Sequence, residues 1–458
     1  MDRLLRALAE VVGPRHVLTD PDLTAGYAVD WTGRFRGRAP AVVRPADTTE
    51  VAGVLALLAG AGRPVVPQGG NTGLVGGSVP LHGEIVLSLR RLDGIGPVEV
   101  LAGQVTAGAG ATLAAVEAAA RHHDLAFGVD LAARDSATIG GMVATNAGGL
   151  RMLRYGNMRA QVMGVEAVLA DGRVLSHLAG LTKDNTGYDL AGVLTGSEGT
   201  LAVITRVRLR LVPRLPARTV GLLAFGRVEA ALQALAELRR RLPGCLEAAE
   251  LFFADGVELV CRHAGIPPPF GRPHPVYLLV EAAARTDPAE ELAGAVVEGV
   301  GELTLDGAVD SEPAGRVRLW RYREGHTEAI NAAGIPVKLD VALPAGELAG
   351  FVPRVREVVA AAAPGARTLL FGHAADGNLH VNVLGAGERA GPVEDAVLRL
   401  VSGLGGSISA EHGIGTAKRR WLHLNRTPAE LDAFRAIKAA LDPKGILNPH
   451  VLLPEATG

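Results

Sequence analysis

Hydrophobic residues recur with helical and strand spacings along the first half of this chain. Residues 51–61 form an apolar helical run, and Asp47 followed three positions later by Glu50 is a capping pattern at its start. Pro64 prevents the helix from continuing, and the apolar pair at residues 65–66 begins a strand. The pattern therefore predicts that helices alternate with strands in this half of the chain.

Two pairs of short apolar segments predict β-hairpins. Residues 165–169 and 173–175 flank an Asp-Gly turn. Residues 368–371 and 379–384 flank an Asp-Gly-Asn turn, in which Gly and Asn tolerate the positive φ angles of a tight turn.

A proline-containing stretch at residues 213–216 separates the first half from a region in which strands alternate with amphipathic helices. The expected strands are residues 219–225, a segment that ends at 252, and 276–281, and the expected helices are 227–241, 288–298 and 427–441. This order of elements predicts an α+β domain of ferredoxin-like character. The expected division of the chain is 1–213, 214–425 and a C-terminal helical segment, 426–458.

The composition excludes several classes of protein. The chain has 46 Lys and Arg against 48 Asp and Glu, so its net charge of −2 argues against a nucleic-acid-binding surface. Only two cysteines occur, without a C-x-x-C pattern, which excludes a disulfide framework and indicates a reducing compartment. No secretory signal and no apolar run of about 20 residues is visible. We therefore expect a soluble, cytoplasmic protein, and its 458 residues favour two or three domains.

Three glycine-rich passages lie in the first half of the chain, at residues 67–78, 136–149 and 196–205. The first has five glycines within twelve residues, so its backbone N–H groups can approach a ligand closely, although it lacks the Gly-Lys-Ser/Thr ending of a P-loop. The second is too rich in Gly for a stable helix interior and too apolar for a disordered linker. Together the three passages fit a large planar cofactor with a diphosphate.

The second hairpin carries candidate metal ligands. It places His373 at the end of one strand and His380 at the start of its partner, and Glu411 follows in a Glu-His-Gly-Ile-Gly segment. Two imidazoles and a carboxylate form a set that suits Zn or Mn with one position left open. From this segment alone, a pair of structural histidines in an apolar strand is the commoner explanation.

Six segments resemble one family of flavoproteins in their order and spacing. They are residues 67–78, 138–149, 196–205, 373–382, 411–415 and 441–449. Over nearly its whole length the chain resembles the FAD-linked oxidases of the p-cresol methylhydroxylase (PCMH) and vanillyl-alcohol oxidase fold. It looks most similar to their D-2-hydroxy acid dehydrogenase branch, which holds D-2-hydroxyglutarate dehydrogenase, D-lactate dehydrogenase and the glycolate oxidase flavin subunit.

The resemblance implies an α+β protein with a PCMH-type FAD-binding domain at 1–213. A substrate (cap) domain at 214–425 would hold the metal site, and the C-terminal segment would return to the FAD-binding domain. The residues that would hold FAD are Pro67, Gly69, Gly70, Asn71, Thr72, Gly73, Gly77, Ser78, Ser136, Thr138, Ile139, Gly140, Asn146, Glu198, Gly199 and Ile204. Relatives with covalent flavin often have a His at the position of Asn71, and residues 67–78 contain neither His nor Cys, so non-covalent FAD is expected.

The same resemblance implies a metal site and a substrate site. Zn or Mn would be held by His373, His380 and Glu411, and the substrate would be bound by Arg323, Thr327, Lys338, Asn382 and His412. Independently of the resemblance, Arg323 and Thr327 are four positions apart, which places them on one face of a helix. Asn382 alternates with His380, so both point to the same side of their strand.

The expected reaction is oxidation of a D-2-hydroxy acid to the 2-oxo acid by hydride transfer from C2 to flavin N5. A hydroxyl is too weak an acid for a His base near neutral pH, but a divalent cation lowers the pKa of bound oxygen by several units, about eight for Zn-bound water. His412 would then be the general base, while Arg323 and Lys338 fix the carboxylate. The two positively charged side chains, Arg323 and Lys338, favour a dicarboxylate substrate such as D-2-hydroxyglutarate. D-lactate and glycolate stay open as alternative substrates.

Two alternatives come from other classes of protein. A metal-dependent hydrolase would use the two histidines and Glu411 with water, but it leaves the glycine-rich passages unexplained. A flavin-binding subunit of an electron-transfer complex would hold FAD without oxidising a hydroxy acid. For the enzyme, the expected electron acceptor is an electron-transfer flavoprotein, a quinone or a cytochrome, and the sequence allows a homodimer.

Overall fold

The computed structural model describes residues 2–454, so residues 455–458 of the expected C-terminal segment lie outside it. The chain folds into two compact units. The first unit holds residues 2–149, 155–214 and 411–454, and the second holds 150–154 and 215–410. The chain leaves the first unit close to the expected boundary, but it rejoins this unit at Glu411 rather than at residue 426.

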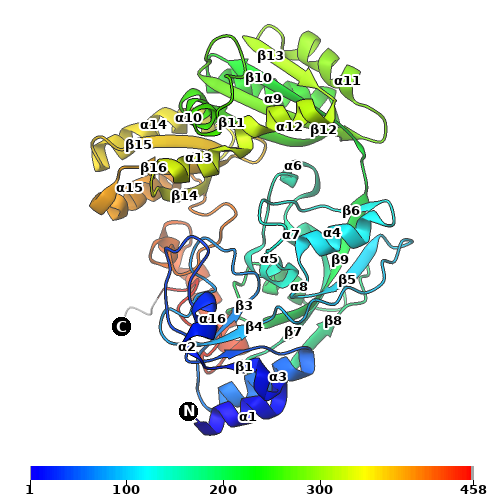
Figure 1. Cartoon of the computed structure of the whole chain (residues 1–458), viewed down its shortest axis with the longest axis vertical. Coiled ribbons are helices and arrows are strands. Elements are labelled where there is room, and N and C mark those ends of the chain that lie inside the picture. The colour runs from blue at the N-terminus through cyan, green and yellow to red at the C-terminus, as the bar shows by residue number, and fades with distance from the viewer. Residues whose placement is uncertain (1, 455–458) are drawn as a thin grey trace. The chain divides into compact units, whose positions relative to one another are not determined.

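The first unit contains two sheets (Figure 1). Its strands are β1 (Val17–Leu18), β2 (Val42–Val43), β3 (Val65–Gln68), β4 (Ile85–Ser88), β5 (Gln104–Gly108), β6 (Leu125–Phe127), β7 (Val162–Val168), β8 (Val174–His177) and β9 (Val203–Pro213). Strands β2, β3 and β4 are parallel in a sheet of order β1-β2-β4-β3. The other sheet is antiparallel, of order β5-β9-β7-β8 with β6 paired to β9, and it contains the predicted β7–β8 hairpin.

Helices connect and cover these strands. They are α1 (Asp2–Val12), η1 (Pro14–His16), α2 (Pro21–Thr24), η2 (Ala25–Tyr27), α3 (Thr48–Gly60), α4 (Leu113–Arg121), α5 (Ile139–Thr145), α7 (Met158–Gln161), α8 (Leu190–Leu194), η5 (Arg419–Leu424) and α16 (Pro428–Leu441). The predicted cap of α3 is confirmed, because Asp47 Oδ1 accepts a hydrogen bond from Glu50 N at 2.8 Å. The predicted helix at the C-terminus is confirmed as α16, which begins with a complete capping box at Thr427.

The expectation that the second glycine-rich passage is not helical is wrong, because its central residues form α5. Gly140 packs so tightly on Ala109 that an added Cβ would lie 2.5 Å from the Ala109 Cβ. This close backbone packing outweighs the low helix propensity of Gly, which is worth only about 1 kcal/mol per residue. Asn146 ends the helix in the left-handed conformation, with φ of 50°.

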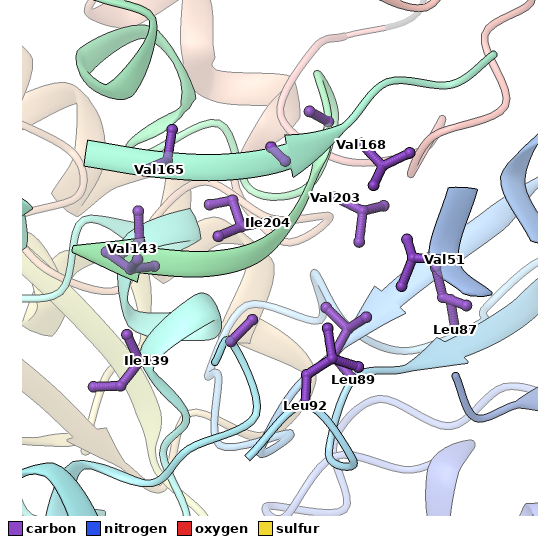
Figure 2. Close-up of a cluster of buried hydrophobic side chains, with 14 of the residues drawn as sticks. Val51, Leu87, Leu89, Leu92, Ile139, Val143, Val165, Val168, Val203 and Ile204 are labelled. Carbon is purple, nitrogen blue, oxygen red and sulfur yellow. The ribbon is translucent and has the colours of Figure 1, made fainter. Parts of the chain in front are cut away.

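A hydrophobic core joins the helices of the first unit to both of its sheets. Figure 2 shows Val51 of α3, Leu87 of β4 and Val203 of β9 in one cluster, and each is at most 1% exposed. Ile139 of α5 and Ile204 of β9 belong to the same core. The elements that carry the glycine-rich passages are therefore fixed by apolar burial.

The second unit is built on one antiparallel sheet of order β13-β10-β12-β11-β15-β16-β14. Its strands are β10 (Ala217–Phe225), β11 (Leu246–Phe253), β12 (Val276–Ala284), β13 (Asp306–Asp310), β14 (Val337–Ala342), β15 (Arg367–His373) and β16 (Asn378–Leu384). The first four strands have the order of a ferredoxin-like motif, so the predicted α+β character is confirmed. The predicted hairpin is β15–β16, which extends this sheet beyond β11.

Helices lie on both faces of this sheet. They are α9 (Val228–Arg241), α10 (Ala254–Ala264), α11 (Ala289–Gly294) with the π-helical η3 (Ala295–Val300), α12 (Pro313–Glu324), α13 (His326–Ala333), α14 (Leu348–Ala362), η4 (Gly387–Arg389) and α15 (Ala390–Gly403). Helices α10, α12 and α13 pack on the face that carries Phe252, Tyr277 and Phe371. Helices α14 and α15 lie side by side next to the β14–β16 end of the sheet (Figure 1).

A short segment from the first half of the chain also belongs to the second unit. Residues 150–154 lead into α6 (Met152–Tyr155), and Arg154 Nη1 donates a hydrogen bond to the Ala283 carbonyl at 3.0 Å. Arg154 and Arg151 each approach the buried Glu247 carboxylate to 3.8 Å. Within residues 2–454, no helix is both long and apolar enough to cross a membrane.

We expect a buried histidine to make the second unit sensitive to acid. His326 is 0% exposed, lies against Phe252 and Phe371, and donates from Nδ1 to the Arg323 carbonyl at 3.1 Å. Burial, with the nearby Arg323 charge, lowers the pKa of His326 to about 3. Below pH 6.5 the unfolded chain therefore takes up a proton that the folded chain does not, and stability is lost as the pH falls.

We expect His326→Gln to remove this loss. Between pH 7 and pH 5 the wild-type protein should lose about 2 kcal/mol more stability than the variant, since each pH unit is worth about 1.4 kcal/mol per proton. Thermal melts across this pH range measure the difference. The exposed His122→Gln serves as the control, and equal acid sensitivity of wild type and His326→Gln would contradict the prediction.

Candidate functional site

The three glycine-rich passages of the first unit pack directly on one another. An added Cβ at Gly70 would overlap the Ser136 carbonyl, and one at Gly199 would lie 3.3 Å from Pro67 Cγ. Glycine is required at Gly70 because the first and second passages approach each other backbone to backbone. The structure therefore brings together the passages that the sequence analysis assigned to one cofactor.

Each passage contains one non-glycine residue in the left-handed conformation. The φ angles are 58° at Asn71, 50° at Asn146 and 52° at Glu198. Such residues are uncommon and tend to gather at ligand sites. Beside them, Thr72 is half-buried, Gly73 and Ser136 are exposed, and an added Cβ at Gly73 would meet no atom within 4 Å. Strained turns around exposed backbone fit a large ligand with a diphosphate, as FAD requires.

Asn71 holds the first passage in shape. Its Nδ2 donates to the Val29 carbonyl at 2.8 Å, and its Oδ1 accepts from Ser78 Oγ at 2.8 Å. Both ends of the amide are therefore used within the protein. Buried hydroxyls lie nearby in the other passages, where Thr138 Oγ1 and Ser197 Oγ have no hydrogen-bond partner among the described residues.

Three residues that were expected to contact FAD have other surroundings. Ile139 and Ile204 are 0% and 4% exposed and their side chains belong to the hydrophobic core, so their contact with FAD stays a prediction. Glu198 is buried, and its carboxylate is used inside the protein.

Glu198 anchors the segment that contains Glu411 and His412. Its Oε1 accepts a hydrogen bond from Ile414 N at 2.8 Å, and its Oε2 accepts one from Gly415 N at 2.7 Å. Burial raises the pKa of Glu198, against the effects of these two bonds and of the Lys418 charge. The carboxylate thereby holds residues 411–415 on the first unit.

Asn448 completes this connection. Its Nδ2 donates to the carbonyls of Gly77 and Glu198, both at 2.8 Å. One amide therefore joins the first passage, the third passage and the C-terminal segment. The second passage meets the same segment at Gly148, where an added Cβ would lie 2.9 Å from Glu411 Oε1. Glu411 and His412 thus belong to the FAD-binding unit and not, as expected, to the substrate domain.

The candidate metal ligands of the second unit are His373 and His380, which lie diagonally across the β15–β16 hairpin. Phe371 is opposite His380 and His373 is opposite Asn378, so both imidazoles are on one face of the sheet. Their ring centroids are 5.6 Å apart. The predicted placement of the pair on a hairpin is therefore confirmed.

A buried carboxylate lies beside the Nδ1 atom of each imidazole. His373 Nδ1 is 2.6 Å from Glu250 Oε1, and His380 Nδ1 is 3.6 Å from Asp340 Oδ1. Glu250 and Asp340 are both 0% exposed. The hydrogen bond between Glu250 and His373 Nδ1 makes Nε2 of His373 the nitrogen that can bind a metal, which is the usual arrangement of histidine ligands, whereas Asp340 lies beside His380 beyond hydrogen-bond distance. The pair therefore fits a divalent cation.

The predicted substrate residues of the second unit share the histidine face or lie above it. Lys338 of β14 is opposite Asn382 of β16, two positions from the Asp340–His380 pair. Burial lowers the pKa of Lys338. Arg323 of α12 lies with its Cζ 4.6 Å from the centre of the Phe371 ring.

Thr327 is not on the same helix as Arg323. Gly325 interrupts the helical segment between α12 and α13. Thr327 is exposed, whereas Arg323 is buried. The prediction of one helical face for this pair is wrong, because residue spacing does not report a break at a glycine.

Sequence reasoning missed Glu250, Asp340 and Asn448. Glu250 and Asp340 are single acidic residues inside otherwise apolar strands, and a charge in such a strand needs a partner when it is buried. That signal was available in the sequence. Asn448 gave no comparable signal, because its role depends on contacts with residues far away in the chain.

We expect Glu198→Gln to weaken the first unit and its hold on FAD. The amide offers one acceptor to two N–H donors, so one charge-assisted bond worth about 1.5–3 kcal/mol is lost. The melting temperature and the FAD content of purified protein measure the effect. Glu10→Gln, at an exposed position of α1, is the matched control. A Glu198→Gln protein with unchanged melting temperature and FAD content would show that the hydrogen bonds of Glu198 to the backbone of residues 414–415 are dispensable.

Two family models match this chain. The model described as "FAD binding domain" matches residues 39–177, and the model described as "FAD linked oxidases, C-terminal domain" matches residues 214–452. The solved structure of p-cresol methylhydroxylase with substrate bound has a TM-score of 0.77 and 16% identity, covering 98% of this chain and 96% of that chain. This likeness confirms the PCMH-type fold.

Curated relatives are similar over nearly the full chain. D-2-hydroxyglutarate dehydrogenase, mitochondrial, of Bos taurus is 40% identical, covering 98% of this chain and 83% of its own length. D-2-hydroxyglutarate dehydrogenase of Xanthomonas citri pv. viticola is 38% identical, covering 98% of this chain and 97% of its own length. The chain is thus an FAD-binding oxidoreductase that belongs to the FAD-linked oxidases, in the branch that contains the D-2-hydroxyglutarate dehydrogenases.

Proposed function

We propose that this protein oxidises a D-2-hydroxy dicarboxylate, such as D-2-hydroxyglutarate, to the 2-oxo acid, with non-covalent FAD and a divalent cation. The observation that carries the proposal is the histidine face of the second unit. There two imidazoles, each with a carboxylate at Nδ1, share a sheet face with Lys338 and Asn382, and Arg323 lies above it. The names of the relatives support the same substrate.

The cation would be Zn or Mn, held by His373, His380 and, from the family resemblance, Glu411. Imidazole nitrogens with a carboxylate ligand suit either ion. The Glu250 carboxylate supports this assignment because its hydrogen bond to His373 Nδ1 favours the tautomer in which Nε2 can bind a cation. When bound, the cation would acidify the substrate hydroxyl and FAD would accept the hydride from C2.

The other residues would position the substrate and move its proton. Arg323 and Lys338 would hold carboxylates, Asn382 would add a hydrogen bond, and His412 would take the hydroxyl proton as general base. Thr327 stays a candidate contact on α13. Fixing both ends of the substrate is positioning, which lowers the barrier by removing unproductive orientations.

A dicarboxylate substrate fits the two positively charged side chains, Arg323 and Lys338, better than a monocarboxylate does. A dicarboxylate can place one carboxylate at Arg323 and the other at Lys338, whereas a monocarboxylate has only one carboxylate to offer to the two side chains. Each charge-assisted hydrogen bond is worth about 1.5–3 kcal/mol, which is roughly ten- to a hundredfold in affinity. The electron acceptor would be an electron-transfer flavoprotein, a quinone or a cytochrome, and a cytoplasmic location would suit the two cysteines of the chain.

We expect the purified protein to be yellow and to release free FAD when denatured by acid or heat. Asn71 offers no atom for a flavin linkage, and both ends of its amide are bonded within the protein. The absorbance of the supernatant after precipitation measures the release. Flavin that remains with the precipitate would contradict the non-covalent assignment.

We also expect D-2-hydroxyglutarate to bleach the flavin under anaerobic conditions, with a kcat/KM higher than that of D-lactate. A chelator should abolish bleaching without removing FAD, because the two histidines and the glycine-rich passages belong to different units. If Lys338 binds the distal carboxylate, Lys338→Ala should reduce the difference in kcat/KM between D-2-hydroxyglutarate and D-lactate.

Three results would contradict these expectations. Full turnover in a protein shown by elemental analysis to be metal-free would remove the cation from the proposal. A tenfold preference of the wild-type protein for D-lactate or glycolate would show the dicarboxylate assignment to be wrong. Bound FAD that no 2-hydroxy acid bleaches would favour a flavin-binding subunit of an electron-transfer complex.

A further inference from the structure

Glu250 contacts both His373, a proposed ligand of the cation, and Arg323, a proposed ligand of the substrate carboxylate. It lies on β11 directly opposite His373 of β15 and is 0% exposed. Its Oε1 is 2.6 Å from His373 Nδ1, and its Oε2 accepts a hydrogen bond from Arg323 Nε at 2.6 Å. Each oxygen of this carboxylate therefore has one charged or polarised partner.

The contact with His373 determines which nitrogen of the imidazole is available. An ionised carboxylate can only accept hydrogen bonds, so Nδ1 must carry the proton that lies between the two groups. Nε2 of a neutral His373 then carries the lone pair that can bind a cation.

The contact with Arg323 orients the guanidinium. Glu250 engages Nε, and the ring of Phe371 lies 4.6 Å from Cζ. Between residues 2 and 454, only Glu250 accepts a hydrogen bond from this guanidinium. The edge formed by Nη1 and Nη2 is thus left for another carboxylate, and a guanidinium edge binds a carboxylate with two parallel hydrogen bonds.

We propose that Glu250 is a shared positioning residue, which sets the cation-binding tautomer of His373 and the carboxylate-binding orientation of Arg323 at the same time. The inference rests on the proposed function and deepens it, because cation affinity and substrate affinity then depend on one buried side chain. Glu250 does not touch the substrate or the cation and acts only through its two partners.

Glu250→Gln tests this arrangement. Glutamine has one acceptor and one donor group, but its two partners, His373 Nδ1 and Arg323 Nε, both donate. Only one partner can be satisfied, so at least one of two affinities should fall about tenfold. The first is the affinity of the FAD-loaded protein for Zn²⁺ or Mn²⁺ alone, measured by chelator competition. The second is the KM for the 2-hydroxy acid that the wild-type protein oxidises fastest.

Glu247→Gln is the matched control. Glu247 lies on the same strand, is 1% exposed and pairs with Arg218 at 2.8 Å. Its ion pairs are with Arg151, Arg154 and Arg218, so its loss should lower the melting temperature without changing cation affinity or KM. Glu250→Asp is the second variant, because it keeps the charge but is one methylene too short to reach both partners.

The outcomes separate this inference from the proposed function. A wild-type protein that binds no cation and oxidises no 2-hydroxy acid would overturn both. Cation affinity and KM within twofold of wild type in Glu250→Gln and in Glu250→Asp, in a wild-type background that binds and turns over, would overturn the shared role of Glu250 alone. The expected result is a tenfold weakening of cation affinity or a tenfold rise in KM in either Glu250 variant, while Glu247→Gln keeps the cation affinity and KM of the wild type.

Discussion

A carboxylate that leaves water must receive hydrogen bonds or positive charge inside the protein, because its desolvation costs several kcal/mol. This constraint organises both units of the structure. Glu198 takes its two hydrogen bonds from the backbone of residues 414–415, and Glu250 takes its partners from β15 and α12. Each of these two carboxylates takes its hydrogen bonds from segments that are distant in the sequence, and those segments carry candidate functional groups.

The constraint also explains how strained loops persist in the first unit. Left-handed backbone at Asn71, Asn146 and Glu198 costs of order 1–3 kcal/mol each unless the surroundings stabilise it. Asn448 bonds two of the three passages, and the amide of Asn71 closes the first passage on itself. The C-terminal segment therefore works as a structural part of the cofactor site, although the cofactor passages lie more than 200 residues earlier in the chain.

Local patterns predicted a large part of this structure. The capped helix α3, the hairpins and the ferredoxin-like order of strands all follow from apolar periodicity and turn residues, which are properties of neighbouring positions. The pairing of His373 and His380 followed from the same local signal. The family resemblance added the cofactor, and the comparisons confirm it.

The features that escaped prediction depend on contacts between distant segments. Helix α5 forms because Gly140 packs on Ala109, a contact that no helix propensity contains. The early return of the chain at Glu411 depends on the Glu198 carboxylate, and the orientation of Arg323 depends on Glu250. In each case one buried polar or backbone group selects its partner across the fold, and a single sequence does not reveal that choice.

Residues 150–154 have a consequence for how such proteins can be recombined. Arg151 and Arg154 reach Glu247 from a stretch of chain that lies between two segments of the FAD-binding unit. A module cut at residues 215 and 410 would carry Glu247 without these two cations. In an exchange of this module between flavoproteins, Glu247 would keep Arg218 as an ion-pair partner but would lose two of its three arginines, unless residues 150–154 were transferred as a second, non-contiguous piece of chain.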